Sequence, residues 1–437
     1  IPSLWTNGSG VYAAAAITVT GTDVKITDCT MTGHAGLGVE VSDGCSATVT
    51  GCTITGPGPT YITSTTHNYS AGVHAGAGAR VAATFNDISD YAQGILTSAE
   101  RTDLQIVGNR IHDIRGQHGM YLTQATRGVI SGNLVWSIPL QGMKVQLGTT
   151  TTPDAKNLTI NGNVFQDCGS HGILLTNPSQ PSASRVRGVT VTGNVIENAG
   201  EDGINLTYAA DGIVSGNVVN GATRHGILLD SCDGVDVTNN RVKNVTANGI
   251  HVTNCTDWSV GFNRVKDPGQ GDGASTEFGV YVTGSSSNGA IRGNRVTDAN
   301  GHMRYGIYLV GAVDQPTIAI DDNYVSGASD YGMRGVTGSP LALSCTGNVL
   351  RGTLGAVTAP PANMVSGSAT FGTATMSGAT MVVTHNLGAM PLNVLLTAYG
   401  NVNVWVTARN ATTFTINQSG TGSVIVAWQA QLGGVVS

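Results

Sequence analysis

Apolar and polar residues alternate along this chain in segments of about four residues, which Gly, Asn and Asp separate. One segment type reads x-Gly-apolar-x-apolar, as in the HGILL copies that start at His171 and His225. A period of two predicts β-strands, because successive side chains of a strand point to opposite faces. In the first copy we expect Ile173 and Leu175 to point inward and Leu174 to point outward. Such short strands cannot bury an apolar face alone, so they must stack on one another.

A second motif, a small residue, Gly or Thr followed by Asn-x-Val or Asn-x-Ile, recurs in phase with the first. Its asparagines are 23 to 31 residues apart, most often 23, and Cys29 and Cys52 stand at the same point of two earlier turns. Asn tolerates a left-handed backbone, so we expect it at the turn itself, with its amides stacked from coil to coil. The column consists of Asn86, Asn109, Asn133, Asn163, Asn194, Asn217, Asn240, Asn263, Asn294, Asn323 and Asn348.

Eleven asparagine turns and two cysteine turns predict a parallel β-helix of about 13 coils, with longer coils where loops are inserted. A leucine-rich repeat would need leucine at closer intervals, and an RTX roll would need a repeated Gly-Gly-x-Gly-x-Asp motif. After Asn348 the repeat ends, and alternating strands between Gly-containing turns predict a small antiparallel β-sandwich. We therefore predict an all-β chain with a β-helix domain over 1–355 and a C-terminal β-sandwich module over 356–437, which serves in oligomerisation or glycan binding.

Composition agrees with many strands and turns, because the 437 residues include 61 Gly, 11% charged and 5% aromatic residues. With a formal net charge of -6 and no basic stripe evident along the chain, nucleic acid is not expected as a partner. No apolar run is long enough for a membrane span, so no membrane insertion is expected. The seven cysteines form no CxxC pair, which favours free thiols over a disulfide framework. The repeat begins almost at residue 1, which predicts a fragment or a processed form.

The HGILL-like strands with their GNxI or GNxV turns resemble right-handed parallel β-helix proteins of the pectate-lyase-like superfamily, over roughly residues 11–353. Residues 383–432 are similar to C-terminal modules of bacteriophage tailspikes and tail-associated glycan depolymerases. This resemblance implies a homotrimer that cleaves a bacterial surface polysaccharide, located on the virion tail or otherwise extracellular. The virion-anchoring part of many tailspikes is missing from this sequence. The superfamily contains lyases, hydrolases, epimerases and non-enzymes, so the resemblance leaves the reaction open.

Polar residues gather at two positions of the x-Gly strand, the position before the Gly and the outward position after it. On six consecutive coils these positions carry residues that can do acid–base chemistry, and the common phase places them on one face. Turn packing for a single His, or solvation for a single Lys, is favoured over a functional role, so the prediction of a site rests on the clustering. Inserted loops after the strands of Lys144 and His171 are expected to wall a groove. The set is His118, Tyr121, Lys144, His171, Asp202, Asn205, His225 and His251.

Two reactions fit this face. In β-elimination a base removes the proton α to a uronate carboxylate, a cation neutralises that carboxylate, and an acid protonates the leaving oxygen. Lys144 or His171 is the candidate base, Tyr121 or His118 the candidate acid, and Arg224 or Lys144 the candidate cation.

Glycoside hydrolysis instead needs two carboxylates roughly 5–9 Å apart. Glu201, Asp202 and Asp230 are the candidates, with Arg224 and His225 close to the last of them in sequence. Asp202 and Asp230 belong to neighbouring coils but to different points of the strand, so the sequence does not decide between lyase and hydrolase.

Substrate binding is predicted for the remaining polar and aromatic positions. Tyr281, Tyr305, Tyr308 and Tyr331 form an aromatic patch. Core packing and sugar stacking are both open as its role. The loop around Asp272 carries oxygen ligands of the type that calcium prefers, but an ordinary loop is favoured, and we expect no cofactor and no metal site. The predicted binding residues are Asn205, Arg224, His225, His251, Tyr281 and Tyr308.

Three functions follow. The favoured one is a polysaccharide depolymerase, the second a glycan- or receptor-binding fibre without turnover, and the third a purely structural rod.

Overall fold

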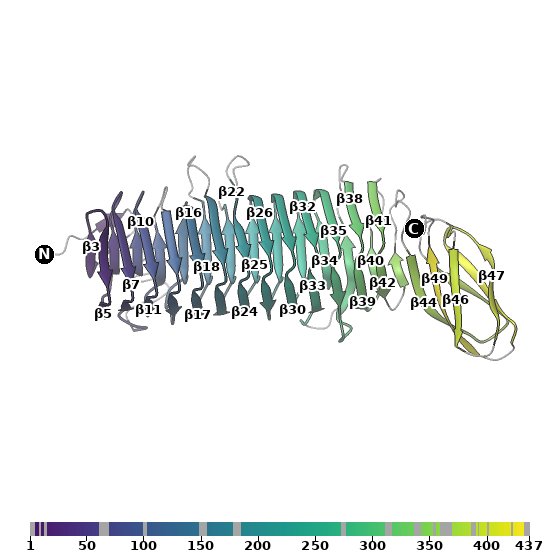
Figure 1. Ribbon diagram of the computed structural model, residues 1–437. Coiled ribbons are helices and arrows are strands. Elements are labelled where there is room, and N and C mark those ends of the chain that lie inside the picture. The colour runs from purple at the N-terminus through teal and green to yellow at the C-terminus, as the bar shows by residue number, and fades with distance from the viewer. Residues whose placement is uncertain are drawn as a thin grey trace. The chain divides into compact units, whose positions relative to one another are not determined.

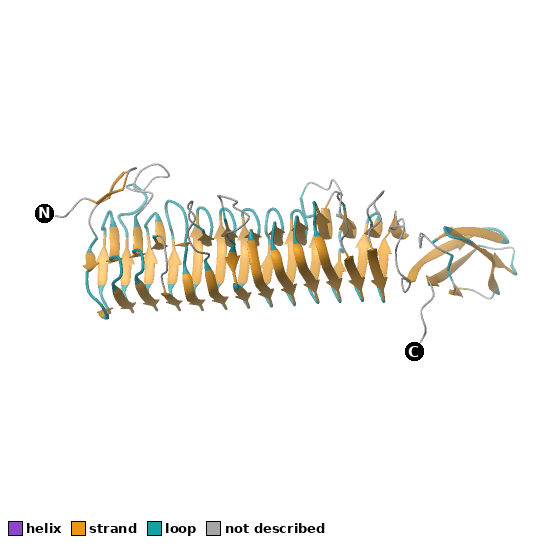
Figure 2. Ribbon diagram, turned by 90° about the horizontal axis from the view of Figure 1, so that it is seen from above, coloured by secondary structure: helices purple, strands orange, loops and turns teal. Residues whose placement is uncertain are grey.

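The computed structural model consists of strands, turns and loops, with no helix among the residues it describes (Figure 2). Its contacts divide the chain into two compact units, residues 1–236 and 237–437, which we treat separately. The described residues are 5–7, 10–12, 15–60, 70–98, 103–147, 155–177, 185–271, 277–310, 317–335, 342–352, 355–358, 369–385, 390–391, 393–399, 402–420 and 423–431.

In the first unit a short antiparallel pair, β1 (Trp5–Asn7) and β2 (Gly10–Tyr12), precedes three parallel sheets. Each coil contributes one strand to each sheet (Figure 1). Sheet I contains β3 (Ile17–Val19), β6 (Leu37–Val41), β9 (Ala71–Ala75), β12 (Gln93–Thr97), β15 (Met120–Thr123), β18 (Met143–Gln146), β21 (Ile173–Thr176), β25 (Ile204–Thr207) and β28 (Ile227–Asp230).

Sheets II and III complete each coil of the first unit. Sheet II contains β4 (Val24–Thr27), β7 (Ser46–Thr50), β10 (Arg80–Thr84), β13 (Asp103–Val107), β16 (Thr126–Ser131), β19 (Lys156–Asn161), β22 (Val186–Arg187), β23 (Thr190–Thr192) and β26 (Ala209–Ser215). Sheet III contains β5 (Thr30–Thr32), β8 (Thr53–Thr55), β11 (Asp87–Ser89), β14 (Arg110–His112), β17 (Leu134–Ile138), β20 (Val164–Cys168), β24 (Val195–Ala199) and β27 (Val218–Asn220).

The alternation predicted for the x-Gly strand is confirmed. Ile173 and Leu175 are fully buried, whereas Leu174 between them is only partly buried. Ile173 pairs in register with Met143 on one side and Ile204 on the other. The interior is therefore a stack of like positions, each covered by its equivalent on the next coil.

The asparagine column lies at the turn from sheet II to sheet III, and its predicted amide stacking is confirmed. Asn163 is representative: its backbone N–H and its Nδ2 both donate to Oδ1 of Asn194, at 3.0 and 2.9 Å. Its Nδ2 also donates to the carbonyl of Ile130, at 2.9 Å. Each amide of this kind thus joins the coil before it to the coil after it and leaves no buried polar group of the turn unpaired.

The turn contains a left-handed residue next to the asparagine. The positive φ belongs to the residue before it, as in Gly162 (φ 63°) and Gly193 (φ 62°). This arrangement lets the Asn point inward, where its amide reaches both neighbouring coils. Cys52 belongs to the same column, because its N–H donates to Oδ1 of Asn86 at 3.0 Å.

The second unit continues the three-sheet pattern after β29 (Asp233–Thr238), the strand that contains the boundary between the units. Sheet IV contains β31 (Ile250–Thr253), β34 (Glu277–Thr283), β37 (Met303–Leu309), β40 (Tyr331–Arg334) and β43 (Gly355–Thr358). Sheet V contains β32 (Thr256–Gly261), β35 (Ser287–Arg292), β38 (Thr317–Asp321) and β41 (Ala342–Thr346). Sheet VI contains β30 (Arg241–Val245), β33 (Arg264–Pro268), β36 (Arg295–Thr297), β39 (Tyr324–Ala328) and β42 (Val349–Gly352).

Pairing changes from parallel to antiparallel within β44 (Ala369–Met376). Its first residues pair in parallel with β42, whereas its whole length pairs antiparallel with β49 (Val424–Gln431), which also pairs with β46 (Asn393–Tyr399). A second antiparallel sheet contains β45 (Thr380–Thr384), β48 (Thr413–Gln418) and β47 (Val404–Arg409).

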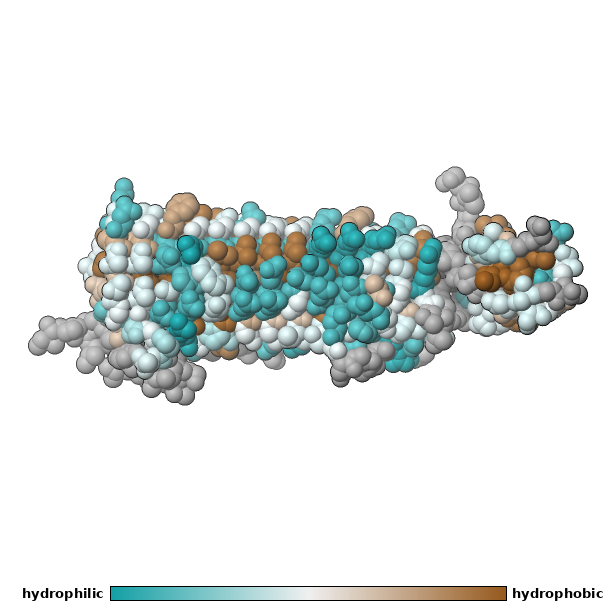
Figure 3. Space-filling view, turned by 90° about the horizontal axis from the view of Figure 1, so that it is seen from below, coloured by the Kyte–Doolittle hydropathy of each residue, from teal (hydrophilic) through white to brown (hydrophobic). Residues whose placement is uncertain are grey.

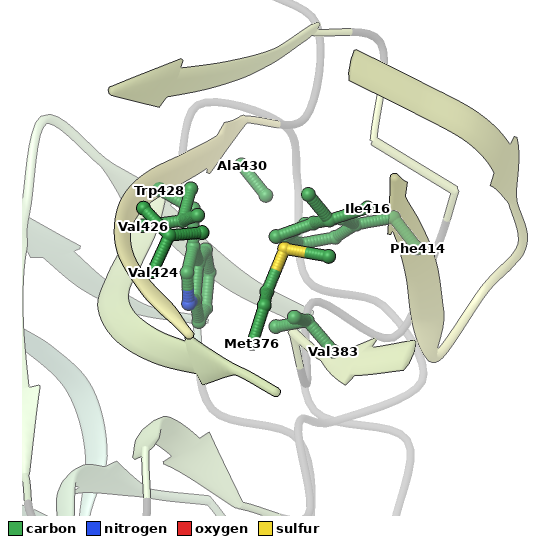
Figure 4. Close-up of a cluster of buried hydrophobic side chains, with 8 residues drawn as sticks. All are labelled: Met376, Val383, Phe414, Ile416, Val424, Val426, Trp428 and Ala430. Carbon is green, nitrogen blue, oxygen red and sulfur yellow. The ribbon is translucent and has the colours of Figure 1, made fainter. Parts of the chain in front are cut away.

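The side chains of Met376, Phe414 and Trp428 point toward one another between these two antiparallel sheets and form a small apolar core (Figure 4). A parallel β-helix followed by a small antiparallel sandwich is therefore confirmed. The domain boundary at residues 355 and 356 stays a prediction.

Surface chemistry varies along the molecule. On the face that Figure 3 shows, a row of apolar surface is bordered by hydrophilic surface.

Six of the cysteines lie among the described side chains, and all six are free thiols, as the sequence predicts. No helix in the described part of the chain has the length and apolarity that crossing a bilayer requires.

Candidate active site

Sheet I brings the predicted polar residues of the first unit onto one face in two parallel columns. In the outward column Tyr121 pairs with Lys144, and Asn205 follows two coils further on. In the other column, before the Gly, the N–H of Gly142 bonds to the carbonyl of His171 and the N–H of Gly172 to that of Asp202. The predicted common face is therefore present in this unit.

The glycine between the two columns is required by the close approach of neighbouring coils. A Cβ on Gly172 would lie 2.6 Å from Cγ2 of Ile196 and 2.8 Å from the carbonyl oxygen of Gly203. Each coil therefore approaches the next without a side chain at this point, and the residues on either side of the Gly stay aligned. This explains why the x-Gly pattern accompanies the candidate site.

Lys144 lies at the centre of the first group of side chains. Its Nζ stands over the ring of Tyr121, 5.1 Å from the centroid, and the ring of His118 meets the same tyrosine edge-on at 4.9 Å. Burial lowers the pKa of Lys144. No carboxylate of a described residue lies within ion-pair distance of its Nζ, and the tyrosine ring stabilises the ammonium through a cation–π contact.

His118 is a buried, neutral imidazole. Burial, helped by the charge of Lys144, lowers the pKa of His118 to about 3. Its Nδ1 has no hydrogen-bond partner among the described residues, and Gln141 of the next coil lies beside the ring. A ring with so low a pKa stays unprotonated at neutral pH, so His118 is unsuited to the role of general acid there.

His171 belongs to a second group, one coil further along. Its Nδ1 accepts the backbone N–H of Asp202 at 3.2 Å, which assigns the proton of the neutral ring to Nε2. Nε2 lies 3.3 Å from Oε2 of Glu201. Burial lowers the pKa of His171, although the nearby carboxylates of Asp202 and Glu201 act in the opposite direction. Both ring nitrogens have partners, so His171 is poorly placed to act as the base.

Asp202 is the fully buried centre of this second group. Oδ1 accepts Nε of Arg224 at 2.7 Å and the N–H of His225 at 3.1 Å. Oδ2 accepts Nη2 of Arg224 and Nδ2 of Asn205, the latter at 2.8 Å. Burial alone would raise the pKa of Asp202, but the hydrogen bonds and charge of Arg224 outweigh it and hold that pKa below its usual value.

These contacts occupy the roughly four lone-pair positions of a carboxylate. Asp202 is therefore an ionised structural anion that orients Arg224, and it has no capacity left to act as a nucleophile or an acid. His225 is neutral as well, because burial lowers its pKa to about 4. The guanidinium of Arg224 stays partly exposed, and its Nη2 also lies 3.7 Å from Oε2 of Glu201.

Three carboxylates were predicted for hydrolysis; Glu201 and Asp202 both lie beside His171 and Arg224, whereas Asp230 lies apart from them. Asp202 aligns with His225 on the next coil, whereas Asp230 aligns with Thr207, five residues further along the strand. Asp202 precedes β25, whereas Asp230 is the last residue of β28, so the two carboxylates lie at different points of their coils. Asp230 accepts a hydrogen bond from Oγ of Ser231 instead, at 2.9 Å.

The remaining predicted binding residues lie on sheet IV of the second unit. His251 stacks on Tyr281 with 4.8 Å between centroids, and Tyr281 stacks on Tyr308 at 5.4 Å. Phe278 and Tyr305 lie against this column, with Phe278 4.7 Å from Tyr308. Burial and the neighbouring Tyr308 raise the pKa of Tyr281.

Arg334 completes this aromatic group, because its guanidinium lies over Tyr308 at 5.1 Å and donates to the hydroxyl of Tyr305 at 2.7 Å. Phe278 and Arg334 were not predicted as site residues, although both occupy the two columns that define the face. Their column position was the signal for them. Tyr331, the last member of the predicted aromatic patch, pairs in register with Tyr305.

Some sequence predictions fall outside the described residues. Asp272 and most of its loop do, as do the middle parts of both inserted loops that follow Lys144 and His171. A concave surface of about 650 Å³ in the first unit lies elsewhere, on sheet II, where Arg80, Asp103 and Arg127 line it.

Two protein families match parts of the chain. The family described as right handed beta helix region matches residues 6–177, and the family described as periplasmic copper-binding protein (NosD) matches residues 140–277. In the parts of the chain with described coordinates, no three His, Cys, Asp or Glu side chains gather in a way that would hold a metal ion. The described residues therefore do not fit a copper site. No curated protein matches the chain.

Solved structures resemble the chain over most of its length. The tailspike gp61 of Pseudomonas phage phi297 is 14% identical with a TM-score of 0.52, and the match covers 90% of this chain and 67% of that one. The Dettilon tailspike protein (gp208) is 12% identical with a TM-score of 0.43, covering 96% and 88%. The periplasmic alginate epimerase AlgG is 15% identical with a TM-score of 0.49, covering 79% and 76%.

The stacked sheets, the family match and the likeness to the phi297 tailspike define the class of fold. The chain is a right-handed parallel β-helix protein, as the sequence predicts. Sequence identities this low establish the fold alone. Any catalytic activity depends on the side chains of sheet I described above.

Proposed function

We propose that this protein processes a uronate-containing bacterial surface polysaccharide and that sheet I of the first unit carries the reaction, a β-elimination. The observation that carries this proposal is the position of Lys144. It is a partly buried cation with a lowered pKa, it contacts Tyr121, and it has no carboxylate partner among the described residues. A lysine in this state is a stronger candidate for a base than an ordinary surface lysine, because its neutral amine is more accessible near neutral pH.

The proposed role of each residue follows from the contacts that its side chain makes. Lys144 is the base, since both nitrogens of His171 have partners. Tyr121 is the acid, because its hydroxyl belongs to the ring that Lys144 contacts, on the same side of the sheet. Arg224, oriented by Asp202 and still partly exposed, is the cation that neutralises the substrate carboxylate. Asn205 and His225 are positioning residues of this arginine.

In the proposed step, Lys144 Nζ takes the proton from the carbon α to the carboxylate. The electron pair left behind is delocalised into the carboxylate, where the guanidinium of Arg224 stabilises the added charge. The pair then forms a double bond between the α and β carbons while the glycosidic C–O bond at the β carbon breaks. The proton of Tyr121 goes to the leaving oxygen. The products are one new saccharide end and one unsaturated uronate.

Hydrolysis is less well supported, because the buried Asp202 has its lone pairs occupied, Glu201 pairs with His171 and Arg224, and Asp230 lies at a different point of its coil. The proposed elimination draws only on groups of the chain, so we expect no cofactor. Activity should therefore be the same before and after treatment with EDTA and dialysis. A loss of activity that calcium restores would contradict this expectation and would direct attention to the loop around Asp272.

The biological setting belongs to the same proposal. A tailspike-like β-helix acts outside the cell on the virion tail, most often as a homotrimer, and the likeness to the phi297 tailspike supports this setting at the level of fold. Large apolar side chains on the C-terminal sandwich, such as Leu395, Tyr399 and Ile425, are exposed in the single chain, as interface residues would be.

Incubation of the protein with purified host-type polysaccharides, anionic and neutral, tests the function. Elimination predicts oligosaccharides with a dehydrated end in mass spectrometry and a new ultraviolet absorbance from the unsaturated uronate. Hydrated ends without that absorbance would mean hydrolysis. If no polysaccharide is cleaved, the proposed enzyme is wrong.

A second candidate function, glycan binding without turnover, is favoured by the aromatic group of sheet IV. The stacked faces of His251, Tyr281 and Tyr308 suit the apolar faces of pyranose rings. This reading predicts glycan binding that survives Lys144→Ala, His171→Ala and Asp202→Ala, with no product at any time.

A further inference from the structure

Three arginines stand directly above one another on the outward side of sheet VI. Arg241 pairs in register with Arg264, and Arg264 pairs with Arg295. All three side chains are exposed, and adjacent coils in such a stack are about 4.8 Å apart. Two residues further along the same strands, Lys243 pairs in register with Lys266. We call these five residues the cationic column.

The arginines of this column have no carboxylate partners among the described residues. Other arginines of the same unit do: Arg292 pairs with Asp321 at 3.2 Å and Arg304 with Asp330 at 2.7 Å. Arg295 instead lies over the ring of Tyr324, 4.5 Å from its centroid.

Two acidic residues on the same coils, Asp267 and Asp298, bond to groups other than the three arginines. Asp267 pairs with Lys266 at 3.3 Å, and its other oxygen accepts the N–H of Ala299. Both oxygens of Asp298 accept backbone N–H groups, those of Asn300 and Met303. Among the described residues, the three guanidinium groups therefore have like-charged neighbours along the column and no carboxylate partner, and Arg295 also contacts the Tyr324 ring.

Like charges directly opposite each other on adjacent strands are destabilising. A second unfavourable feature accompanies them, at the turn that leads into β33. Phe262 has a φ of 55°, which is uncommon for a bulky residue, and its ring is 67% exposed. Exposed aromatic rings and unpaired cations gain most from a ligand that has both apolar ring faces and regularly spaced anions.

We propose that the cationic column binds a linear anionic polysaccharide along the coil axis, as a site separate from the candidate active site on sheet I. One sugar of an extended chain has about the length of one coil spacing, so consecutive carboxylates or sulfates can each meet one arginine. Phe262, which is 67% exposed, offers a ring face for a sugar beside the column. The choice of a uronate-type polymer rests on the proposed function.

The formal net charge of -6 argues for a glycan over nucleic acid as the occupant. A negative protein repels a dense polyanion at long range and attracts it only at the column itself. A glycan with one charge per sugar is less strongly repelled, and the Phe262 ring adds a contact that does not depend on charge.

The test measures the affinity of the full chain for polygalacturonate, dextran sulfate, neutral dextran and duplex DNA by calorimetry. The variant is Arg241→Gln, Arg264→Gln and Arg295→Gln combined. We expect it to weaken binding of polygalacturonate or dextran sulfate at least tenfold, to leave neutral dextran unchanged, and to reduce the salt dependence of binding. Arg264→Lys keeps the charge and should retain most of the affinity.

Matched controls come from exposed arginines of sheet II, Arg80→Gln, Arg127→Gln and Arg187→Gln combined, which should change the affinity less than twofold. The melting temperature of the column variant without ligand should stay equal or rise, because repulsion is removed. Equal affinity of variant and wild type for every polyanion, or no binding of any of them, overturns the proposal. Tighter binding of DNA than of both glycans makes the column a nucleic-acid site instead.

This outcome is distinguishable from failure of the proposed reaction. Cleavage of polygalacturonate or the host glycan with unchanged binding by the column variant would leave the elimination standing and remove the column. Loss of binding in the column variant, with no cleavage by any form of the protein, would do the reverse.

Discussion

At the scale of single residues, the candidate site is built from groups whose protonation is set by burial. His118 and His225 are held neutral, Asp202 is held ionised by Arg224, and Lys144 has a lowered pKa without a carboxylate partner. Only the last of these leaves a group with unused capacity for proton transfer. The site therefore has one strong candidate for a base, set among residues that orient and desolvate it.

Replacement of Lys144 distinguishes a base from a mere cation. Lys144→Arg keeps the positive charge but cannot accept a proton, so we expect kcat to fall 100-fold or more, with polysaccharide affinity within about fivefold of wild type. Lys144→Ala should lose activity to a similar degree. Full activity in Lys144→Arg would assign Lys144 to neutralising the substrate carboxylate instead.

The pH dependence of catalysis follows from the same residue. Because burial lowers the pKa of Lys144, its neutral form appears at a lower pH than that of a solvated lysine. We expect kcat/KM to rise with pH and to level off below the pH at which an ordinary lysine titrates. A profile that falls throughout this range would contradict a lysine base.

Acid stability depends on His118. Its folded-state pKa of about 3 lies below the unfolded value of 6.5, so its contribution to stability is complete above pH 6.5 and is lost as the pH falls toward 3. At pH 4.5 the loss amounts to about 2–3 kcal/mol. His118→Gln should therefore lose less stability than wild type between pH 7 and 4.5 in urea titrations. Parallel losses in both proteins would show that His118 is protonated in the folded state.

Breaking the buried ion pair should be expensive. Arg224→Met leaves the fully buried carboxylate of Asp202 without its main partner, and we expect about 3 kcal/mol of destabilisation. Arg127→Met, which removes an exposed pair with Asp103, is the control and should cost at most about 1 kcal/mol. Equal effects of the two substitutions would mean that the buried pair adds little.

At the scale of elements, the turn column holds the coils in register. Asn163→Leu removes the amide that bonds Ile130 and Asn194 and leaves their buried groups unpaired, so we expect about 3 kcal/mol or more of destabilisation in denaturant unfolding. Asn161→Ala, an exposed position on the neighbouring strand, should change stability by less than about 0.5 kcal/mol. A small effect of Asn163→Leu would show that packing alone sets the register.

Much of the element scale is predictable from the sequence, because the same phase repeats in every coil. The column of asparagines, the inward Ile173 and Leu175, and the shared face of Lys144 and His171 all follow from that phase. The sequence places the turn in or near the left-handed conformation but does not say which residue adopts it, since Asn and Gly both tolerate that backbone and only the amide contacts decide between them.

Contacts between side chains could not be predicted in the same way. The phase places Asp202 beside Arg224 and His225. It does not reveal that Arg224 donates to both carboxylate oxygens of Asp202, through Nε and Nη2. The cationic column was also missed. Its arginines are 23 and 31 residues apart, so no local run of basic residues marks them, and they meet only when the coils stack.

At the scale of the whole molecule, the exposed apolar side chains of the C-terminal sandwich predict an oligomer. Tyr399 and Ile425 pair across two strands, and both side chains are about half or more exposed. We expect the full chain to sediment as a trimer and the double variant Tyr399→Lys, Ile425→Lys to sediment as a monomer. Ala408→Lys on β47 is the control and should remain trimeric. A monomeric wild type would contradict the proposed assembly.

The asparagine turns also give the stack a direction. Each amide donates to the oxygen of the asparagine on the next coil, and never the reverse, from Asn86 through Asn194. A coil that has just left the ribosome therefore presents unfilled donors, and the following coil brings the acceptor that fills them. Growth of the stack in the order of synthesis satisfies one turn at a time. A stack cut short at its later end keeps an unpaired backbone N–H and an unpaired Nδ2 hydrogen at its last turn, whereas one cut at its earlier end keeps an unpaired Oδ1 and an unpaired Nδ2 hydrogen at its first turn.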